Sequence, residues 1–219
     1  MMEIRNRDWK SVVIVREKHN IEDGRHLRSL KTRSKIIRAA HVVFLRDGFQ
    51  KTTIKSIMEQ ADIGYGTVYG HFKGKDDLLI VLMEDIMDKF FEVASIPFFP
   101  STRAEAKEII LNQVLSFLKI ADTEREIMKV FSEGMGLSPK VNEKWEEIRL
   151  KFIQSITKDI TYSQVKGLAR TDLKAELAAR SWFFSNEMYQ WEIVFNQGMY
   201  SLDEIAWTLT TMYVDAIYL

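Results

Sequence analysis

The chain has 219 residues, 46% of them hydrophobic, with 31 basic and 31 acidic side chains, so it can bury the core of one large or two small domains. It contains no cysteine, which excludes disulfide bonds and thiolate metal sites and fits a reducing compartment. No apolar run approaches the roughly 20 residues that cross a bilayer. The charged first 30 residues do not resemble a signal peptide, so we expect a cytoplasmic protein without a membrane partner.

The zero net charge conceals a segregation of charge along the chain. Residues 1–75 contain 16 Lys and Arg against 8 Asp and Glu, a net charge of +8, and residues 76–219 carry a net charge of −8. A basic N-terminal part is the electrostatic footprint of a protein that binds a polyanion. The alternative, charges that only solvate a surface, explains their abundance but not their segregation and ranks second.

Residues 1–28 form a basic N-terminal extension. Its basic residues are Arg5, Arg7, Lys10, Arg16, Lys18, Arg25 and Arg28. One interpretation is an arm that follows the DNA backbone or enters a minor groove. The other, which we favour, is a mobile tail or a start codon placed too early.

The first predicted helix spans about residues 32–47. Its apolar positions recur at helical spacing and predict one buried stripe, made of Ile36, Ala39, Ala40, Val43 and Phe44. Gly48 is a suitable left-handed terminator, and Phe49 can make the apolar contact that accompanies such helix ends. His41 has no partner in the pattern, so a structural role is favoured over a catalytic one.

Residues 52–75 predict two short helices joined by a tight turn. The first covers about residues 54–61 and is capped by Thr52 or Thr53. The turn follows at residues 62–64, where Gly64 can take backbone angles that other residues avoid. The second helix covers about residues 65–71, with Val68 and Phe72 as its anchors. A short second helix with polar and aromatic residues outside is typical of a helix-turn-helix.

The remaining residues predict further helices with clear boundaries. One runs over about residues 75–95 and ends at the proline-containing segment 96–100. Capping patterns at Thr102, Thr123 and Ser138 open the next three, which end near residues 120, 134 and 166. Another begins at Thr171 or Asp172 and ends near residue 197, before Gly198. The last follows Ser201 to about residue 219.

Four segments in this order and spacing resemble the N-terminal domain of the TetR family of bacterial transcriptional regulators. They are KIIRAAHVVFLRDGF, TTIKSIMEQADI, GYGTVYGHF and KGKDDLL, within residues 33–80. The resemblance implies an all-α fold, with a three-helix helix-turn-helix DNA-binding domain at residues 29–75 and a helical ligand-binding and dimerisation domain at residues 76–219. It implies a sequence-specific regulator of double-stranded DNA, a ligand-released repressor that binds a palindromic operator as a homodimer, without cofactor or enzymatic activity.

Matching the family motif residue by residue implies a set of DNA-contacting positions. They are Thr53, Gly64, Tyr65, Gly66, Thr67, Tyr69, His71, Lys73 and Lys75. The family commonly has serine at the position of Gly64, and Gly70 also removes a side chain from a position that often reads sequence. Recognition is therefore expected to depend more on DNA shape and deformability. As alternatives, Tyr69 is a core aromatic, and Lys73 and Lys75 are solvated surface lysines.

The resemblance also implies a dimer interface and an effector pocket in the C-terminal part. The predicted dimer residues are Leu177, Trp182, Phe184, Met188, Trp191, Ile205, Leu209, Met212, Tyr213 and Ala216. The predicted pocket residues, which suit a small apolar or aromatic effector, are Phe90, Phe117, Met128, Phe131, Met135, Trp145, Phe152 and Phe183. The acidic residues Glu133, Glu187 and Glu192 either pair with a cationic ligand or face water. The alternatives are a monomeric core and aromatic residues that only fill it.

Two other functions compete with this interpretation. An all-helical enzyme is the first, but the four histidines show no metal-ligand spacing and no glycine loop suits a phosphate. The second is an interaction module that binds DNA without sequence preference or not at all. Operator specificity and the salt dependence of binding separate that module from a regulator.

Overall fold

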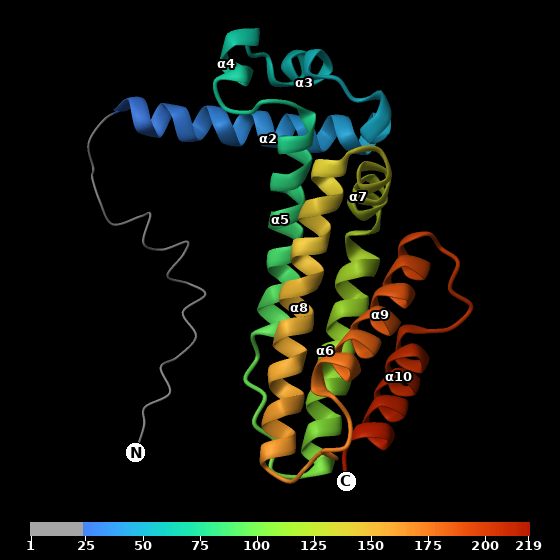
Figure 1. The fold of residues 1–219 in the computed structure, drawn as a ribbon. Helices are drawn as coiled ribbons and strands as arrows, with labels where there is room; N and C mark the ends of the chain where they lie inside the picture. Colours follow the sequence, from blue (N-terminus) through green and yellow to red (C-terminus); the bar gives the residue numbers. More distant parts are fainter. Residues whose placement is uncertain (1–23) are drawn as a thin grey trace. The chain divides into compact units, whose positions relative to one another are not determined.

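The computed structural model describes residues 24–219. Of these, residues 24–35 belong to one compact unit of the chain and residues 36–219 to another. Residues 1–23, which make up most of the predicted N-terminal extension, lie outside the described residues. Helix α2 (Gly24–Lys51) includes the rest of that extension, so it starts eight residues before the expected position. The described residues contain helices and no strand (Figure 1), which confirms the all-α prediction.

The regular part of α2 ends at Gly48, where the sequence predicted a terminator. Gly48 has a φ of +72°, a conformation that favours glycine. Phe49 follows and stacks on Phe44, with 6.1 Å between the ring centroids. The predicted stripe from Ile36 to Phe44 is buried.

The helix-turn-helix consists of α3 (Ile54–Ala61) and α4 (Tyr65–Tyr69). The bounds of α3 agree with the prediction, and Thr53 caps it by accepting a hydrogen bond from the Ser56 N–H. The turn differs from the prediction. Asp62, with a φ of +47°, is the left-handed residue, whereas Gly64 has an ordinary φ of −70°. An aspartate tolerates the left-handed region better than most residues with side chains.

The rest of the chain folds into longer helices (Figure 1). They are α5 (Lys75–Ala94), α6 (Arg103–Thr123), α7 (Arg125–Leu137), α8 (Pro139–Val165), α9 (Ala175–Val194) and α10 (Leu202–Ile217). Helix α6 packs against α9 and α10, and α8 packs against α7 and α9. Three predicted N-caps are confirmed, since Thr102, Ser138 and Ser201 each accept a backbone hydrogen bond from the first turn of their helix.

The predicted boundaries around α7 were wrong. Thr123 does not cap α7, because its hydroxyl donates backwards to the Lys119 carbonyl within α6 at 2.8 Å. Gly134 does not end α7 but lies inside it. A Cβ at Gly134 would come within 2.4 Å of the Leu79 side chain, so this glycine permits the close approach of α5 and α7.

Helix α9 is shorter at both ends than the sequence suggested. It begins at Ala175, and in the preceding loop the Arg170 Nε donates to Asp172 at 2.8 Å. It ends at Val194, three residues before the predicted end, and Asn196 with a φ of +55° is the left-handed residue that follows it.

Two hydrophobic clusters hold residues 36–219 together. The first joins α2 and the helix-turn-helix to α5, α7 and the N-terminal half of α8, and includes Phe44, Val68, Leu79 and Phe131. The second joins α6, α9 and α10 to the C-terminal half of α8. The first cluster contains residues on both sides of Lys75. Helices α5 and α7 therefore share one core with the helix-turn-helix. Within the described residues, no helix is long and apolar enough to span a membrane.

Candidate DNA-binding surface and effector cavity

Helix α4 turns one side chain inward and most of the others outward. Val68 is fully buried, and Phe72 just after the helix is 4% exposed, so both predicted anchors are confirmed. Tyr65, Thr67 and Tyr69 are exposed, and His71 is half-buried beyond the helix end. A short helix with one buried anchor presents nearly its whole surface to a partner.

Tyr65 and Tyr69 form a pair on this surface. Their ring centroids are 4.4 Å apart, and Tyr69 is 42% exposed, which excludes the alternative that it is a core aromatic. Hydrogen bonding to Tyr65, with a smaller effect of desolvation, raises the pKa of Tyr69. Both side chains are exposed, and a tyrosine hydroxyl can donate to an outside acceptor such as a phosphate oxygen.

The glycines around α4 are not required by the packing of the protein. A Cβ built at Gly64 or Gly66 would meet nothing within 4 Å, and one at Gly70 would touch only carbonyl oxygens of the same helix at 3.4 Å. None of the three has a positive φ. The missing side chains leave room for the backbone of another molecule to approach.

Thr53 is more constrained than the sequence suggested. Its N–H donates to the Ser56 hydroxyl at 3.1 Å, and its own hydroxyl oxygen accepts from the Ser56 N–H at 3.1 Å. These two reciprocal hydrogen bonds form a capping box at the start of α3. A phosphate that contacts Thr53 therefore has to share its N–H and hydroxyl with Ser56.

Lys73 and Lys75 have different environments. Lys73 is exposed, in agreement with a side chain that can reach a phosphate. The Lys75 ammonium donates to the carbonyl oxygens of Phe49, Gln50 and Thr52 at 2.7, 3.1 and 3.1 Å, and it lies 4.4 Å from the Phe49 ring centroid. Its three hydrogens are therefore engaged, so we correct its predicted phosphate contact to a structural role.

Two carboxylates connect the segments on either side of the helix-turn-helix to the remaining helices. Glu133 on α7 accepts from the N–H groups of Phe49 and Gln50, at 2.6 and 3.0 Å. Asp77 on α5 accepts from the Lys73 N–H at 2.7 Å and from the Lys140 ammonium on α8. Glu133 therefore faces the protein itself rather than ligand or water.

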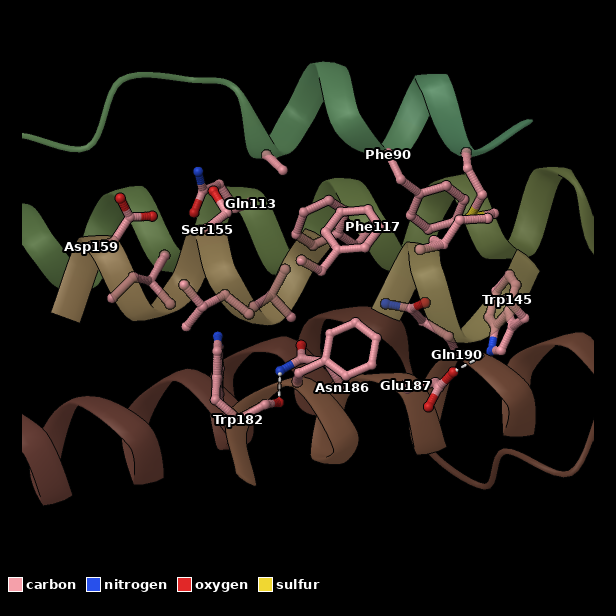
Figure 2. A pocket seen from close by; sticks show the side chains of 18 residues that line it. Phe90, Gln113, Phe117, Trp145, Ser155, Asp159, Trp182, Asn186, Glu187 and Gln190 are labelled. Atoms are coloured by element: carbon pink, nitrogen blue, oxygen red, sulfur yellow. Dashed lines mark hydrogen bonds between the residues drawn. The ribbon is translucent and has the colours of Figure 1, made fainter. Parts of the chain in front are cut away.

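A cavity of about 90 Å³ lies among α5, α6, α8 and α9 (Figure 2). Five of the predicted pocket residues line it: Phe90, Phe117, Trp145, Phe152 and Phe183. The prediction was wrong for the three residues of α7, Met128, Phe131 and Met135, which pack in the first hydrophobic cluster. Helical spacing alone does not distinguish an aromatic side chain at a cavity from one in a core.

Sequence reasoning missed most of the polar lining of this cavity. Gln113, Ser155, Asp159, Asn186 and Gln190 line it together with Glu187, which the sequence did single out. Glu187 is 6% exposed and accepts from the Trp145 Nε1 and the Arg149 Nε, both at 2.8 Å. In Figure 2, Asp159 and Glu187 lie at opposite ends of the cavity.

The predicted dimer residues divide into three groups by exposure. Leu177, Phe184, Met188, Met212 and Ala216 are exposed on α9 and α10. Ile205, Leu209 and Tyr213 are at most 9% exposed, so their prediction as interface residues is corrected to core packing. Trp182 stacks on Tyr213, with centroids 4.1 Å apart, and Trp191 packs near Trp145.

The sequence missed other exposed apolar residues in the same region. Phe195 extends the α9 stripe by two turns beyond Met188, and Trp207 is exposed on α10. Seven-residue spacing from Leu177 to Phe184 and from Met188 to Phe195 is the signal that identifies the stripe. Solvated apolar side chains in such a row are typical of a surface that associates with a partner.

Residues 36–82 match the family model for bacterial regulatory proteins of the tetR family. The match covers α2 from Ile36, the helix-turn-helix and the beginning of α5. It therefore includes the exposed tyrosine pair and Lys73.

Two curated proteins are similar to parts of the chain. The fatty acid metabolism regulator protein of Bacillus subtilis is 39% identical over 57 residues, which cover 26% of this chain and 29% of that protein. The chain thus spans less than a third of that relative's length. The HTH-type transcriptional regulator UidR of Escherichia coli K12 is 22% identical over 163 residues, covering 72% of this chain and 79% of UidR.

A solved structure, the SmeT–triclosan complex, has the same fold. It superposes with a TM-score of 0.68 at 17% sequence identity, covering 86% of this chain and 92% of that one.

Proposed function

We propose that this chain, which belongs to the TetR family of DNA-binding transcriptional regulators, is a repressor that binds a palindromic operator as a homodimer and is released by a small ligand. The observation that best supports DNA binding by this surface is the exposed outer face of α4. Its exposed tyrosine pair and the glycines beside it fit a duplex that approaches closely.

On this surface Tyr69, Thr67 and Lys73 contact phosphates, which fix the position of α4 on the duplex. Tyr65 and His71 contact sugars or base edges. Few side chains are available for bases, so specificity depends largely on the sequence-dependent shape of the DNA. Lys75 supports this surface from behind by its hydrogen bonds to the end of α2.

A homodimer is proposed because the exposed stripe on α9 and α10 needs a partner and one short helix reads too little DNA. Two-fold symmetry places two copies of α4 on two half-sites of a palindrome. The exposed residues Phe184, Met188 and Met212 form the centre of the proposed interface.

The ligand acts through helices that connect the cavity to the helix-turn-helix. Helices α5 and α8 both line the cavity. At the N-terminal end of α5, Asp77 accepts from the Lys73 N–H and is paired with Lys140 at the N-terminal end of α8. A ligand that fits better when these helix ends are displaced shifts the population toward a form with badly placed recognition helices. Glu133 adds a second connection, from α7 to the end of α2.

The test is fluorescence anisotropy of the purified full chain on the DNA upstream of its own gene. A scrambled duplex of the same composition is the control, and both titrations are repeated at several salt concentrations. We expect tight binding to the upstream DNA alone, with log affinity falling by about 0.9 per neutralised phosphate per unit of log salt.

Equal and weak binding to both duplexes contradicts sequence-specific binding to the DNA upstream of the gene. Selection of bound fragments from the whole genome then separates the remaining possibilities. Enrichment of one palindromic sequence restores a specific regulator, and no enrichment favours the interaction module.

A further inference from the structure

The polar groups of the cavity define the chemistry of its ligand, an inference that rests on the proposed function. Its apolar wall contains aromatic rings from four helices. Phe90 and Phe117 stack at 6.0 Å between centroids, as do Phe152 and Phe183. A volume of about 90 Å³ is several times the roughly 10–15 Å³ that one water needs, which suits a compact ligand with one ring.

Asn186 provides a buried acceptor at this wall. The residue is 7% exposed, and its Nδ2 donates to the Trp182 carbonyl at 2.8 Å. Its Oδ1 has no hydrogen-bond partner among the described residues. Rotating the amide by 180° would lose the bond to Trp182, so the oxygen keeps its orientation and requires a donor.

The charged groups of the cavity have one sign. Among the lining residues, all of them within the described part of the chain, Asp159 and Glu187 are acidic and none is Lys, Arg or His. Arg149 compensates Glu187 from outside the lining, where its Nε donates to Glu187 at 2.8 Å. An anionic ligand would therefore enter without a basic partner and beside a carboxylate, which is costly in a buried site.

We propose that the effector is an aromatic molecule that bears a protonated amine, and that Asn186 Oδ1 accepts one of its N–H hydrogens. The ring of the ligand packs among Phe117, Phe152 and Phe183. The negative faces of such rings attract the ammonium, and Asp159 supplies the opposite charge at one end of the cavity (Figure 2).

Three small probes with the same ring test the class. They are 2-phenylethylammonium, the neutral 2-phenylethanol and the anionic 3-phenylpropionate, each titrated into the full chain by calorimetry. We expect the ammonium to bind about tenfold or more tightly than the alcohol, because hydrogen bonds that involve a charged group are the stronger ones. The carboxylate should bind most weakly.

Two variants assign the interaction to its residues. Asn186→Leu removes the acceptor and should weaken ammonium binding about tenfold. Asn112→Leu, at an exposed position of α6, is the matched control and should not change it. Asp159→Asn retains the shape of the side chain and should reduce the preference for ammonium over alcohol, which keeps the test decisive if Asn186→Leu does not fold.

Ammonium binding that is no tighter than carboxylate binding overturns the proposal, as does the absence of binding by all three probes. Ammonium binding that is unchanged in both cavity variants also overturns it. Operator binding, measured by anisotropy on the same samples, distinguishes a wrong ligand class from a wrong proposed function. A carboxylate that binds and releases the operator refutes the ligand class alone, whereas a chain without operator specificity refutes the function.

Discussion

The outer face of α4 and the cavity among α5, α6, α8 and α9 differ in how they are built. The α4 face consists of consecutive residues on one five-residue helix, nearly all exposed. The cavity draws its lining from four helices between residues 87 and 190, most of it buried or half-buried. Substitutions on the face should therefore change DNA binding without changing the fold, while substitutions in the cavity affect packing as well as ligand binding.

The largest expected effect comes from separating the two recognition helices. Replacing Phe184 and Met188 together by glutamate places charges on the exposed α9 stripe and should produce monomers. Operator affinity should fall about 100-fold or more, because linked binding to two half-sites is lost. Sedimentation and anisotropy measure the two changes.

The control carries glutamate at Leu150 and Val165, exposed apolar residues of α8. It should remain dimeric and bind the operator normally. A monomeric Phe184 and Met188 variant with full operator affinity would refute the dimeric mode of recognition.

The next effect concerns the phosphate contacts on the α4 face. Tyr69→Phe combined with Lys73→Ala should weaken operator binding about tenfold or more and reduce the salt slope by about 1. Both side chains are exposed, so thermal unfolding followed by circular dichroism should not change. Unchanged affinity would show that these groups do not face the DNA.

A glycine substitution separates stability from DNA binding most cleanly. Gly66→Ala meets nothing within 4 Å and should stabilise the protein by about 0.5–1 kcal/mol, because alanine loses less backbone freedom in a helix. Operator affinity should nevertheless fall about tenfold, since the new methyl group occupies space that the duplex needs.

Gly136→Ala is the matched control, because it also lies in a helix and meets nothing within 4 Å. It should give a similar gain in stability with unchanged operator affinity. If both variants bind the operator like the native chain, the exposed glycines are not sites of close approach.

The smallest effect is a pH dependence at Asp77, between the two regions. Partial burial acts to raise the pKa of Asp77, but hydrogen bonds from the Lys140 ammonium and the Lys73 N–H outweigh it, so the pKa is lowered from 3.8. The charged form is thus favoured in the folded state, and its contribution is present above about pH 4 and lost as the pH falls below it.

Asp77→Asn should therefore cost about 1 kcal/mol or less near neutral pH and almost nothing in acid. Urea unfolding of both proteins on either side of about pH 4 measures the difference. An equal cost at every pH would show that the charge of Asp77 does not contribute.

The contrast between the two regions also explains what the sequence could predict. The bounds of α3, the Thr53 cap and the exposure of Tyr65 were accessible, because caps and anchor spacing are local features. Lys75 was misassigned because the carbonyl oxygens that it contacts come from a segment about 25 residues earlier. The hydrogen bonds of Lys75 to these carbonyl oxygens form only in the tertiary structure.

The cavity was only partly predictable for the same reason. The predicted aromatic residues on α5, α6, α8 and α9 line the cavity, whereas Phe131 on α7, which the sequence placed in the same set, is a core residue. Asn186 gave no signal, because an asparagine within a helix usually faces solvent. Its significance follows only from the burial of its oxygen and from the bond that orients its amide.

The most direct test of a connection between the two regions is the reciprocal coupling of their ligands. Operator affinity is measured with and without saturating 2-phenylethylammonium, and the affinity for this ligand is measured with and without the operator. We expect the ligand to weaken operator binding and the operator to weaken ligand binding by the same factor, as linkage requires. A ligand that binds in the cavity and leaves operator affinity unchanged would contradict release by that site.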